Sequence, residues 1–180
     1  MEDFIPESQP IFQSASHSAG VYKLLLHPIN REVCASCSVD CSIKIWNFNQ
    51  EPYGEPKTLQ GHFGYVVDIV WLTTSDKLAS ASFDGTVKIW DTYKAQCLFT
   101  LQEGLGYVQS ISATKSGLYL ASAGHDGQVY FWNTKTGTLV SKWESPGRIM
   151  ITAFNSSNNK LIVTSYASVT VLELSFHQTK

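Results

Sequence analysis

Histidine, serine and aspartate, the three residue types of a hydrolase triad, follow one another along this chain as His62, Ser80 and Asp84. In a triad the serine attacks the substrate, the histidine accepts its proton and the aspartate orients the histidine. The same types recur at matching offsets, as His17, Ser36 and Asp40 and again as Ser122 and Asp126. A single catalytic centre would not be repeated in this way. The recurrence favours structural hydrogen bonding, and the sequence predicts no catalytic residue.

One phrase of fourteen residues contains the recurring serine and aspartate. It stands at 34–47 as CASCSVDCSIKIWN, at 78–91 as LASASFDGTVKIWD and at 120–133 as LASAGHDGQVYFWN. A weaker copy, KLIVTSYASVTVLEL at 160–174, has Leu172 in place of the tryptophan. The tryptophans Trp46, Trp90 and Trp132 recur about every 40–45 residues, which is the period of a four-stranded propeller blade.

Three cysteines lie close together with a spacing, C-x2-C-x3-C, that is also found in zinc sites. The repeat aligns Cys34, Cys37 and Cys41 with Leu78, Ala81 and Gly85, two strand positions and one turn position. Alternate residues of a strand point to opposite faces, so Cys34 and Cys37 cannot share a metal ion. We expect small buried thiols, no metal and no cofactor. Reduced thiols fit an intracellular compartment.

The residues around the second copy alternate between strand and turn signals. The stretches 64–72, 78–82, 86–91 and 97–102 are rich in β-branched, aromatic or small residues, and they predict the four strands of one blade. Polar residues at 73–77 and 91–95 predict the turns. The pairs Asp84-Gly85 and Asp126-Gly127 predict tight hairpins, because glycine adopts positive φ at low cost.

On these residues the chain resembles the WD40-repeat family over nearly its whole length, which implies an all-β fold of about four four-stranded antiparallel propeller blades. In that family histidine, serine, aspartate and tryptophan form a hydrogen-bonded relay inside each blade. The matching residues are His17, Ser36, Asp40, Trp46, His62, Ser80, Asp84, Trp90, Ser122, Asp126 and Trp132. Gly104 stands in the histidine slot of the third blade, so we expect a broken relay there. The fourth blade lacks the relay.

We expect a single unit over 1–180, with an N-terminal segment at 1–16 and blades at 17–60, 61–102, 103–143 and 144–180. Ile11–Gln13 matches an outer strand that lacks its own blade, and the fourth blade stops after its third strand at 169–174. Three geometries share this pattern: a closed ring of four blades, half of a dimeric ring, and part of a longer ring. Because four blades of a larger ring leave two apolar flanks bare, we favour an incomplete propeller.

The resemblance also implies which positions face the rim of the propeller, where partners bind: the residue before each turn aspartate and two residues of each first strand. The predicted rim residues are Tyr22, Val39, Tyr65, Val67, Phe83, Tyr107, Gln109, His125, Arg148, Met150 and Tyr166, with Gly20 beside Tyr22. Tyrosine, phenylalanine, arginine and methionine are enriched at protein interfaces. The rim is therefore the predicted binding site.

The sequence predicts a non-enzymatic scaffold, intracellular and either cytoplasmic or nuclear, that binds proteins or peptides on this rim. A net charge of −2 gives no reason to expect nucleic acid, and no apolar run is long enough to span a membrane. No small-molecule substrate is expected. One alternative is a structural partial propeller that completes a homodimer or a hetero-assembly through its open flanks. Another, from a weaker resemblance to the C-terminal blades of transducin beta-like corepressor subunits, is a nuclear corepressor subunit that binds histone tails.

Overall fold

The chain folds into four antiparallel sheets in the computed structural model, which describes residues 16–49, 53–72, 76–104 and 106–175. Blade 1 contains β1 (Val21–Leu26), β2 (Val33–Ser38), β3 (Ile43–Asn47) and β4 (Lys57–Leu59). Blade 2 contains β5 (Val66–Leu72), β6 (Lys77–Ser82), β7 (Val87–Asp91) and β8 (Gln96–Leu101). Blade 3 contains β9 (Val108–Ala113), β10 (Tyr119–Gly124), β11 (Gln128–Asn133) and β12 (Thr138–Glu144). Blade 4 contains β13 (Ile149–Phe154), β14 (Lys160–Ser165) and β15 (Val169–Glu173).

These sheets confirm the predicted all-β fold of propeller blades. Within each sheet the strands pair in sequence order, so every connection is a hairpin. The outer strand expected at Ile11–Gln13 lies outside the described residues. In the described part of the chain, no helix has the length and hydrophobicity needed to cross a membrane.

The turn between the second and third strands has the same backbone conformation in the first three blades. Gly85 and Gly127 have φ angles of 84° and 73°, in the left-handed region that glycine adopts easily. In blade 1 the aligned residue is Cys41, whose φ is 66°. A non-glycine residue in this region carries backbone strain, so blade 1 keeps the turn at an energetic cost that its neighbours avoid.

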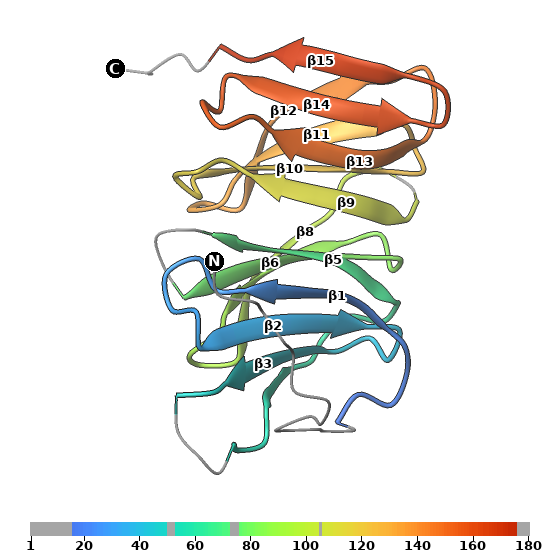
Figure 1. The fold of residues 1–180 in the computed structure, drawn as a ribbon. Helices are drawn as coiled ribbons and strands as arrows, with labels where there is room; N and C mark the ends of the chain where they lie inside the picture. The colour runs from blue at the N-terminus through green and yellow to red at the C-terminus, as the bar shows by residue number, and fades with distance from the viewer. Residues whose placement is uncertain (1–15, 50–52, 73–75, 105, 176–180) are drawn as a thin grey trace, which may run out of the picture.

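The blades stack face to face, and the hydrophobic core lies between them. The first strands β1, β5, β9 and β13 follow one another through the stack (Figure 1). On the second strands, small residues such as Ala79 and Ala81 are fully buried beneath the next blade. Their size lets the sheets approach closely, with larger residues such as Leu120 and Trp132 filling the space from the other side.

Polar contacts also join neighbouring blades along the first strands. Asp68 of blade 2 accepts hydrogen bonds from Lys23 Nζ of blade 1 at 2.7 Å and from the backbone N–H of Ile111 in blade 3 at 2.8 Å. Ser110 of blade 3 accepts one from the backbone N–H of Thr152 in blade 4 at 3.1 Å. These bonds fix the order and spacing of all four blades.

Blades 1 and 4 lie at opposite ends of the stack, so the described sheets form an open arc rather than a closed four-blade ring (Figure 1). Exposed hydrophobic side chains occur on both ends. Completion of the propeller by further blades stays a prediction.

Candidate functional site

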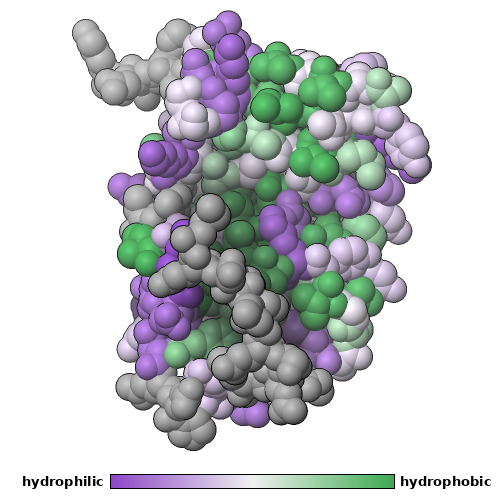
Figure 2. All heavy atoms as spheres, in the orientation of Figure 1, coloured by the Kyte–Doolittle hydropathy of each residue, from purple (hydrophilic) through white to green (hydrophobic). Residues whose placement is uncertain are grey.

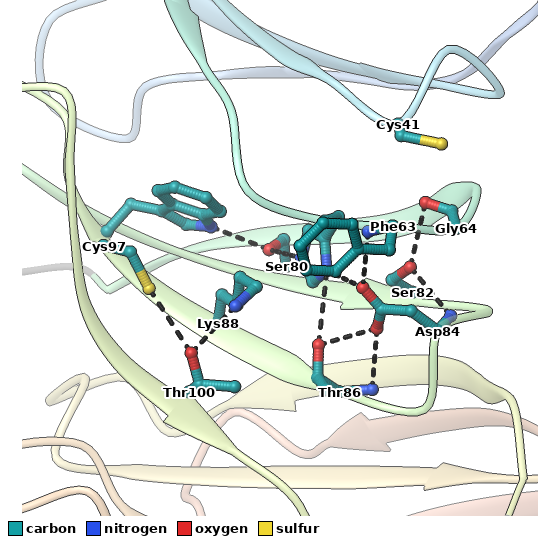
Figure 3. Close-up of polar contacts among 12 residues, drawn as sticks. Cys41, Phe63, Gly64, Ser80, Ser82, Asp84, Thr86, Lys88, Cys97 and Thr100 are labelled. Atoms are coloured by element: carbon teal, nitrogen blue, oxygen red, sulfur yellow. Dashed lines mark hydrogen bonds and ion pairs between the residues drawn. The ribbon is translucent and has the colours of Figure 1, made fainter.

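The turn aspartate of blade 2 is held by a network that starts at the tryptophan of the third strand. Trp90 Nε1 donates to Ser80 Oγ at 2.8 Å, and that oxygen lies 2.7 Å from Nε2 of His62. The other imidazole nitrogen, Nδ1, lies 2.8 Å from Asp84 Oδ2. Asp84 also accepts from the Thr86 side chain and backbone (Figure 3). A neutral imidazole protonated on Nδ1 satisfies the whole chain of bonds.

Blade 1 contains the same network. Trp46 Nε1 donates to Ser36 Oγ at 2.9 Å, and His17 lies 2.8 Å from both Ser36 and Asp40. Ser42 takes the place of the threonine and donates to Asp40 at 2.6 Å. The residues aligned by the repeat therefore meet in space in two blades. In both blades the network ends on the aspartate of the turn between the second and third strands and so holds that turn.

Blade 3 lacks the histidine, but its aspartate still has a side-chain donor. Tyr130 Oη donates to Asp126 Oδ2 at 2.8 Å, and Trp132 Nε1 donates to Ser122 Oγ at 2.8 Å. Tyr130 occupies the strand position of Lys88 in blade 2, whose Nζ donates to Thr100 instead.

Gly104 leaves the space for this tyrosine. A Cβ atom on Gly104 would lie 2.2 Å from Tyr130 Oη and 2.3 Å from Asp126 Oδ2. The residue that replaces the expected histidine is thus required by the substituted network. In blade 3 the tyrosine thus replaces the histidine as the side-chain donor to the aspartate, and the tryptophan and serine form a separate pair.

Burial and hydrogen bonding act in opposite directions on the relay carboxylates. Burial alone would raise the pKa of Asp84, but hydrogen bonds from His62, Thr86 and the backbone N–H of Phe63 hold this pKa well below its usual value. Asp40 behaves in the same way, with Ser42 and His17 as its main donors. Both aspartates are therefore ionised acceptors at neutral pH.

The relay positions the rim, because each turn aspartate follows a predicted rim residue. The backbone N–H of that residue donates to a carbonyl at the start of the first strand of the same blade. In blade 2 Phe83 donates to Tyr65 at 2.9 Å, and in blade 3 His125 donates to Tyr107 at 3.1 Å. Val39 donates to Gly20 in the same way in blade 1. The two parts of the predicted rim are thus adjacent in the first three blades.

Four aromatic rings on this rim form a continuous row, which we call the rim ladder: Tyr65, Phe83, Tyr107 and His125. The Tyr65 and Phe83 ring centroids are 6.0 Å apart, and Phe83 stacks on Tyr107 at 4.8 Å with an interplanar angle of 21°. Tyr107 then lies 5.1 Å from His125. The stacked pair joins blade 2 to blade 3, so the ladder crosses the boundary between blades. Tyr65 and Tyr107 are exposed.

The known proteins that this chain resembles agree with the repeat geometry. The family described as "WD domain, G-beta repeat" matches residues 8–47, 54–91 and 95–133. This chain belongs to the WD40 family. Its blades 1 to 3 contain the matched repeats, and blade 4 lies beyond them. WD40 domains are generally non-enzymatic modules for protein interaction.

Individual relatives match only part of this WD40 chain. Pre-mRNA-processing factor 17 of Homo sapiens is 37% identical over 98 residues, which is 53% of this chain and 16% of that protein. The nuclear distribution protein nudF of Aspergillus niger is 40% identical over 67 residues, 37% of this chain and 15% of that protein. The probable cytosolic iron-sulfur protein assembly protein Ciao1 of Culex quinquefasciatus is 38% identical over 79 residues, 43% of this chain and 23% of that protein. The chain spans less than a quarter of the length of each.

The second predicted rim position falls on an irregularity of each WD40 first strand. The pairing register shifts at Tyr22, Val67, Gln109 and Met150, one residue in each blade. Such bulges re-aim side chains. Tyr22 and Met150 are exposed, but Val67 is only 8% exposed. The prediction of Val67 as a rim contact is therefore wrong, because β5 lies between blades 1 and 3 and neighbours cover both sides of it.

Three further rim residues lie towards the ends of the arc. Arg148 and Tyr166 are exposed on blade 4, and Val39 is half-buried on blade 1. Phe63, which the sequence did not single out, is 92% exposed, and its backbone N–H donates to Asp84 (Figure 3). The sequence could have indicated Phe63, because it directly follows the relay histidine His62 and therefore lies in the same rim loop.

The cysteines of this WD40 chain are spread over strands and turns. Cys34 and Cys37 are buried on β2, Cys41 is half-buried in the following turn, and Cys97 is exposed on β8. Burial raises the pKa of the Cys37 thiol to about 12. Among the described residues, no group of three or more histidine, cysteine or acidic side chains is arranged to hold a metal ion.

Proposed function

We propose that the chain is a non-enzymatic scaffold that binds a segment of another protein on its rim ladder. The observation that carries this proposal is the row of rings from Tyr65 through Phe83 and Tyr107 to His125, with exposed Phe63 beside it. Aromatic rings supply a large contact area at low cost in conformational entropy, and they are common at hot spots of binding. An extended peptide laid across blades 2 and 3 would contact the whole row.

The test uses peptides selected from a random displayed library against the purified chain. Their affinity is then measured by fluorescence anisotropy for the wild type, Tyr107→Ala and Phe83→Ala. Removing one ring of the stacked pair should weaken binding by about tenfold or more. Tyr93→Ala is the matched control, because Tyr93 is an exposed tyrosine in the turn at the opposite end of β7. Equal loss in the control, or no loss in the ladder variants, would refute rim binding.

We propose a second role, assembly through the ends of the arc, because a separate observation favours it. Apolar side chains on the two end blades are exposed, and a face of this kind on a soluble protein marks an interaction site. The two roles use different surfaces and can coexist. The names of the relatives, a pre-mRNA-processing factor and a cytosolic iron-sulfur assembly protein among them, support a location inside the cell, cytoplasmic or nuclear.

A further inference from the structure

We propose that two copies of this chain join head to tail, so that their blades form one closed ring of eight. The forward face of a blade is here the face turned toward the next blade along the chain, and the rear face is the opposite one. In the proposed ring the forward face of blade 4 in each copy packs on the rear face of blade 1 in the other. This proposal rests on the assembly role above and names its partner.

The forward face of blade 4 is the counterpart of a face that is buried elsewhere in the chain. In blade 2 the forward side chains Ala79, Ala81, Val87 and Ile89 are all buried, and blade 3 packs on them. The strand register gives their counterparts in blade 4: Ile162, Thr164, Val169 and Val171. Ile89 is 0% exposed, whereas Val171 is 56% exposed. Blade 4 therefore presents a blade-packing surface whose side chains Ile162, Val169 and Val171 are exposed, and no other described strand packs on it.

This surface is a continuous patch of uncharged side chains across three strands, and the exposed pair Lys160 and Glu173 lies at its edge. Ile162 lies opposite Ala153 on β13 and Val171 on β15 in the sheet register. The neighbouring row runs from Ile151 through Thr164 to Val169. Figure 2 shows hydrophobic side chains gathered over blade 4 at the top of the view.

Blade 1 presents the complementary rear face. Blade 2 buries Val66, Ile69 and Trp71 against blade 1. Their counterparts by register on β1 are Val21, Leu24 and Leu26, and all three are exposed. Leu24 is 60% exposed, whereas Ile69 is 0% exposed. The β1 part of the contact that blade 4 lacks is thus exposed at the other end of the same chain.

The sizes of the side chains in the two faces compensate. In the contact between blades 1 and 2, Ala35 of the forward face and Trp71 of the rear face belong to one cluster. At the proposed contact the counterparts are Ile162 and Leu26. A larger residue replaces the alanine and a smaller one replaces the tryptophan, which keeps the filled volume similar.

A second copy covers both faces at once. The contact is heterologous, so it forms a closed ring if the rotation closes and an open fibre if it does not. Two arcs of four blades give eight, within the range of about 4–8 blades found in propellers. Closure at two copies leaves no apolar end exposed.

The first measurement is the solution mass of the purified chain by light scattering over a wide range of concentration. The proposal expects a folded species of twice the 20.0 kDa of one chain, with no growth to larger masses. A folded monomer at all concentrations would overturn the second copy as partner. A mass that rises continuously with concentration would overturn the closed ring.

Two single variants test the head-to-tail arrangement. Val171→Lys places a charge in the forward face of blade 4, and Leu24→Asp places one in the rear face of blade 1. Each alone should weaken self-association by about 100-fold or more, because the charge would be buried without a partner. A mixture of the two variants should recover a heterodimer, since one of its two contacts is unmodified. Circular dichroism should show that each variant is folded, as expected for residues at exposed positions.

The matched control is Val140→Lys on β12, where the valine is 55% exposed on the outermost strand of blade 3. It should leave the dimer intact. If Leu24→Asp also leaves the dimer intact while Val171→Lys breaks it, two forward faces pair and the head-to-tail ring is wrong.

Experiments can refute the second copy as partner without refuting the assembly role. A monomeric chain that co-purifies from cells with another protein, and loses it on Val171→Lys, would refute the second copy and keep the assembly role. A monomer that enters no complex through Val171 would refute both. Peptide binding on the rim ladder stays independent of either result.

Discussion

Tyr130 donates its hydroxyl hydrogen bond to Asp126 at 2.8 Å, the same distance at which His62 meets Asp84 one blade earlier. A loop histidine in blade 2 and a tyrosine of β11 in blade 3 thus contact the aspartate at the same turn position of their blades. The aspartate is the constant element because its other oxygen fixes the turn: Asp126 accepts from the backbone N–H of Gln128, as Asp84 does from Thr86. This turn holds the preceding residue, His125, on the rim.

Replacing Tyr130 with phenylalanine should destabilise blade 3. The change keeps the ring of buried Tyr130 and removes only the hydroxyl, so the carboxylate of Asp126, an exposed residue, loses its side-chain donor. We expect the free energy of unfolding to fall by about 1–3 kcal/mol, measured by urea denaturation. Tyr93→Phe, at an exposed tyrosine, should change it by less than about 0.5 kcal/mol. Equal effects of the two changes would argue against Tyr130 as the stabilising donor to Asp126.

Gly104→Ala should disrupt the same hydrogen bond, between Tyr130 and Asp126, by filling the space that the two side chains occupy. The added Cβ meets Tyr130 Oη and Asp126 Oδ2, and Gly104 has a φ of 75° that favours glycine. Both effects lower the free energy of unfolding, by about 2 kcal/mol together. Gly54→Ala is the control, because a Cβ there meets nothing within 4 Å. In the double variant Gly104→Ala/Tyr130→Phe the two losses should add only in part, since both remove the same hydrogen bond and only Gly104→Ala strains the backbone.

Acid should unfold this chain partly through its relay aspartates. The pKa of Asp84 is lower in the folded state than its ordinary value of 3.8, so the unfolded state binds protons first as the pH falls. Its contribution to stability is complete above the ordinary pKa and is lost as the pH falls through the folded pKa. Asp84→Asn should therefore lower stability at neutral pH and flatten the stability curve between about pH 5 and pH 2. Asp76→Asn, at an exposed carboxylate, should leave the slope unchanged.

The four cysteines should differ in reactivity toward iodoacetamide. Burial raises the pKa of Cys34 and Cys37, so both stay protonated and inaccessible in the folded chain. Cys97 is exposed and should be alkylated first. Mass spectrometry of peptides from native chain at about pH 8 should find Cys97 labelled before Cys37 by more than about 100-fold in rate. Prompt labelling of Cys37 without denaturant would contradict the packing of β2 beneath blade 2.

The repeat in the sequence was sufficient to predict the strands and the partners of the relay. Ser80, Asp84 and Trp90 lie within one short phrase, and a hairpin sets their spacing, so local sequence determines their geometry. Cys41 shows the same principle, because alignment with Gly85 placed it in the turn where the structure finds positive φ.

Features that depend on two distant segments could not be predicted in this way. Tyr130 reaches Asp126 only because Gly104, far earlier in the chain, leaves space for it. Val67 occupies the same repeat position as exposed Tyr22, but its neighbours on both sides bury it. Contacts across blade boundaries, including the stack of Phe83 on Tyr107, depend on how sheets are placed rather than on any single repeat.

Face-to-face packing gives the blades unequal kinetic protection in a single chain. Among the described sheets, blades 2 and 3 each have two neighbouring blades and blades 1 and 4 have one, and the described part of blade 4 contains three strands. Backbone amides of β6 and β10 should therefore exchange with deuterated solvent only on global unfolding, and those of β15 by local opening. Local unfolding should therefore begin at the end blades, blade 1 and blade 4. Packing a partner against both end blades would turn the least stable segments into interior ones.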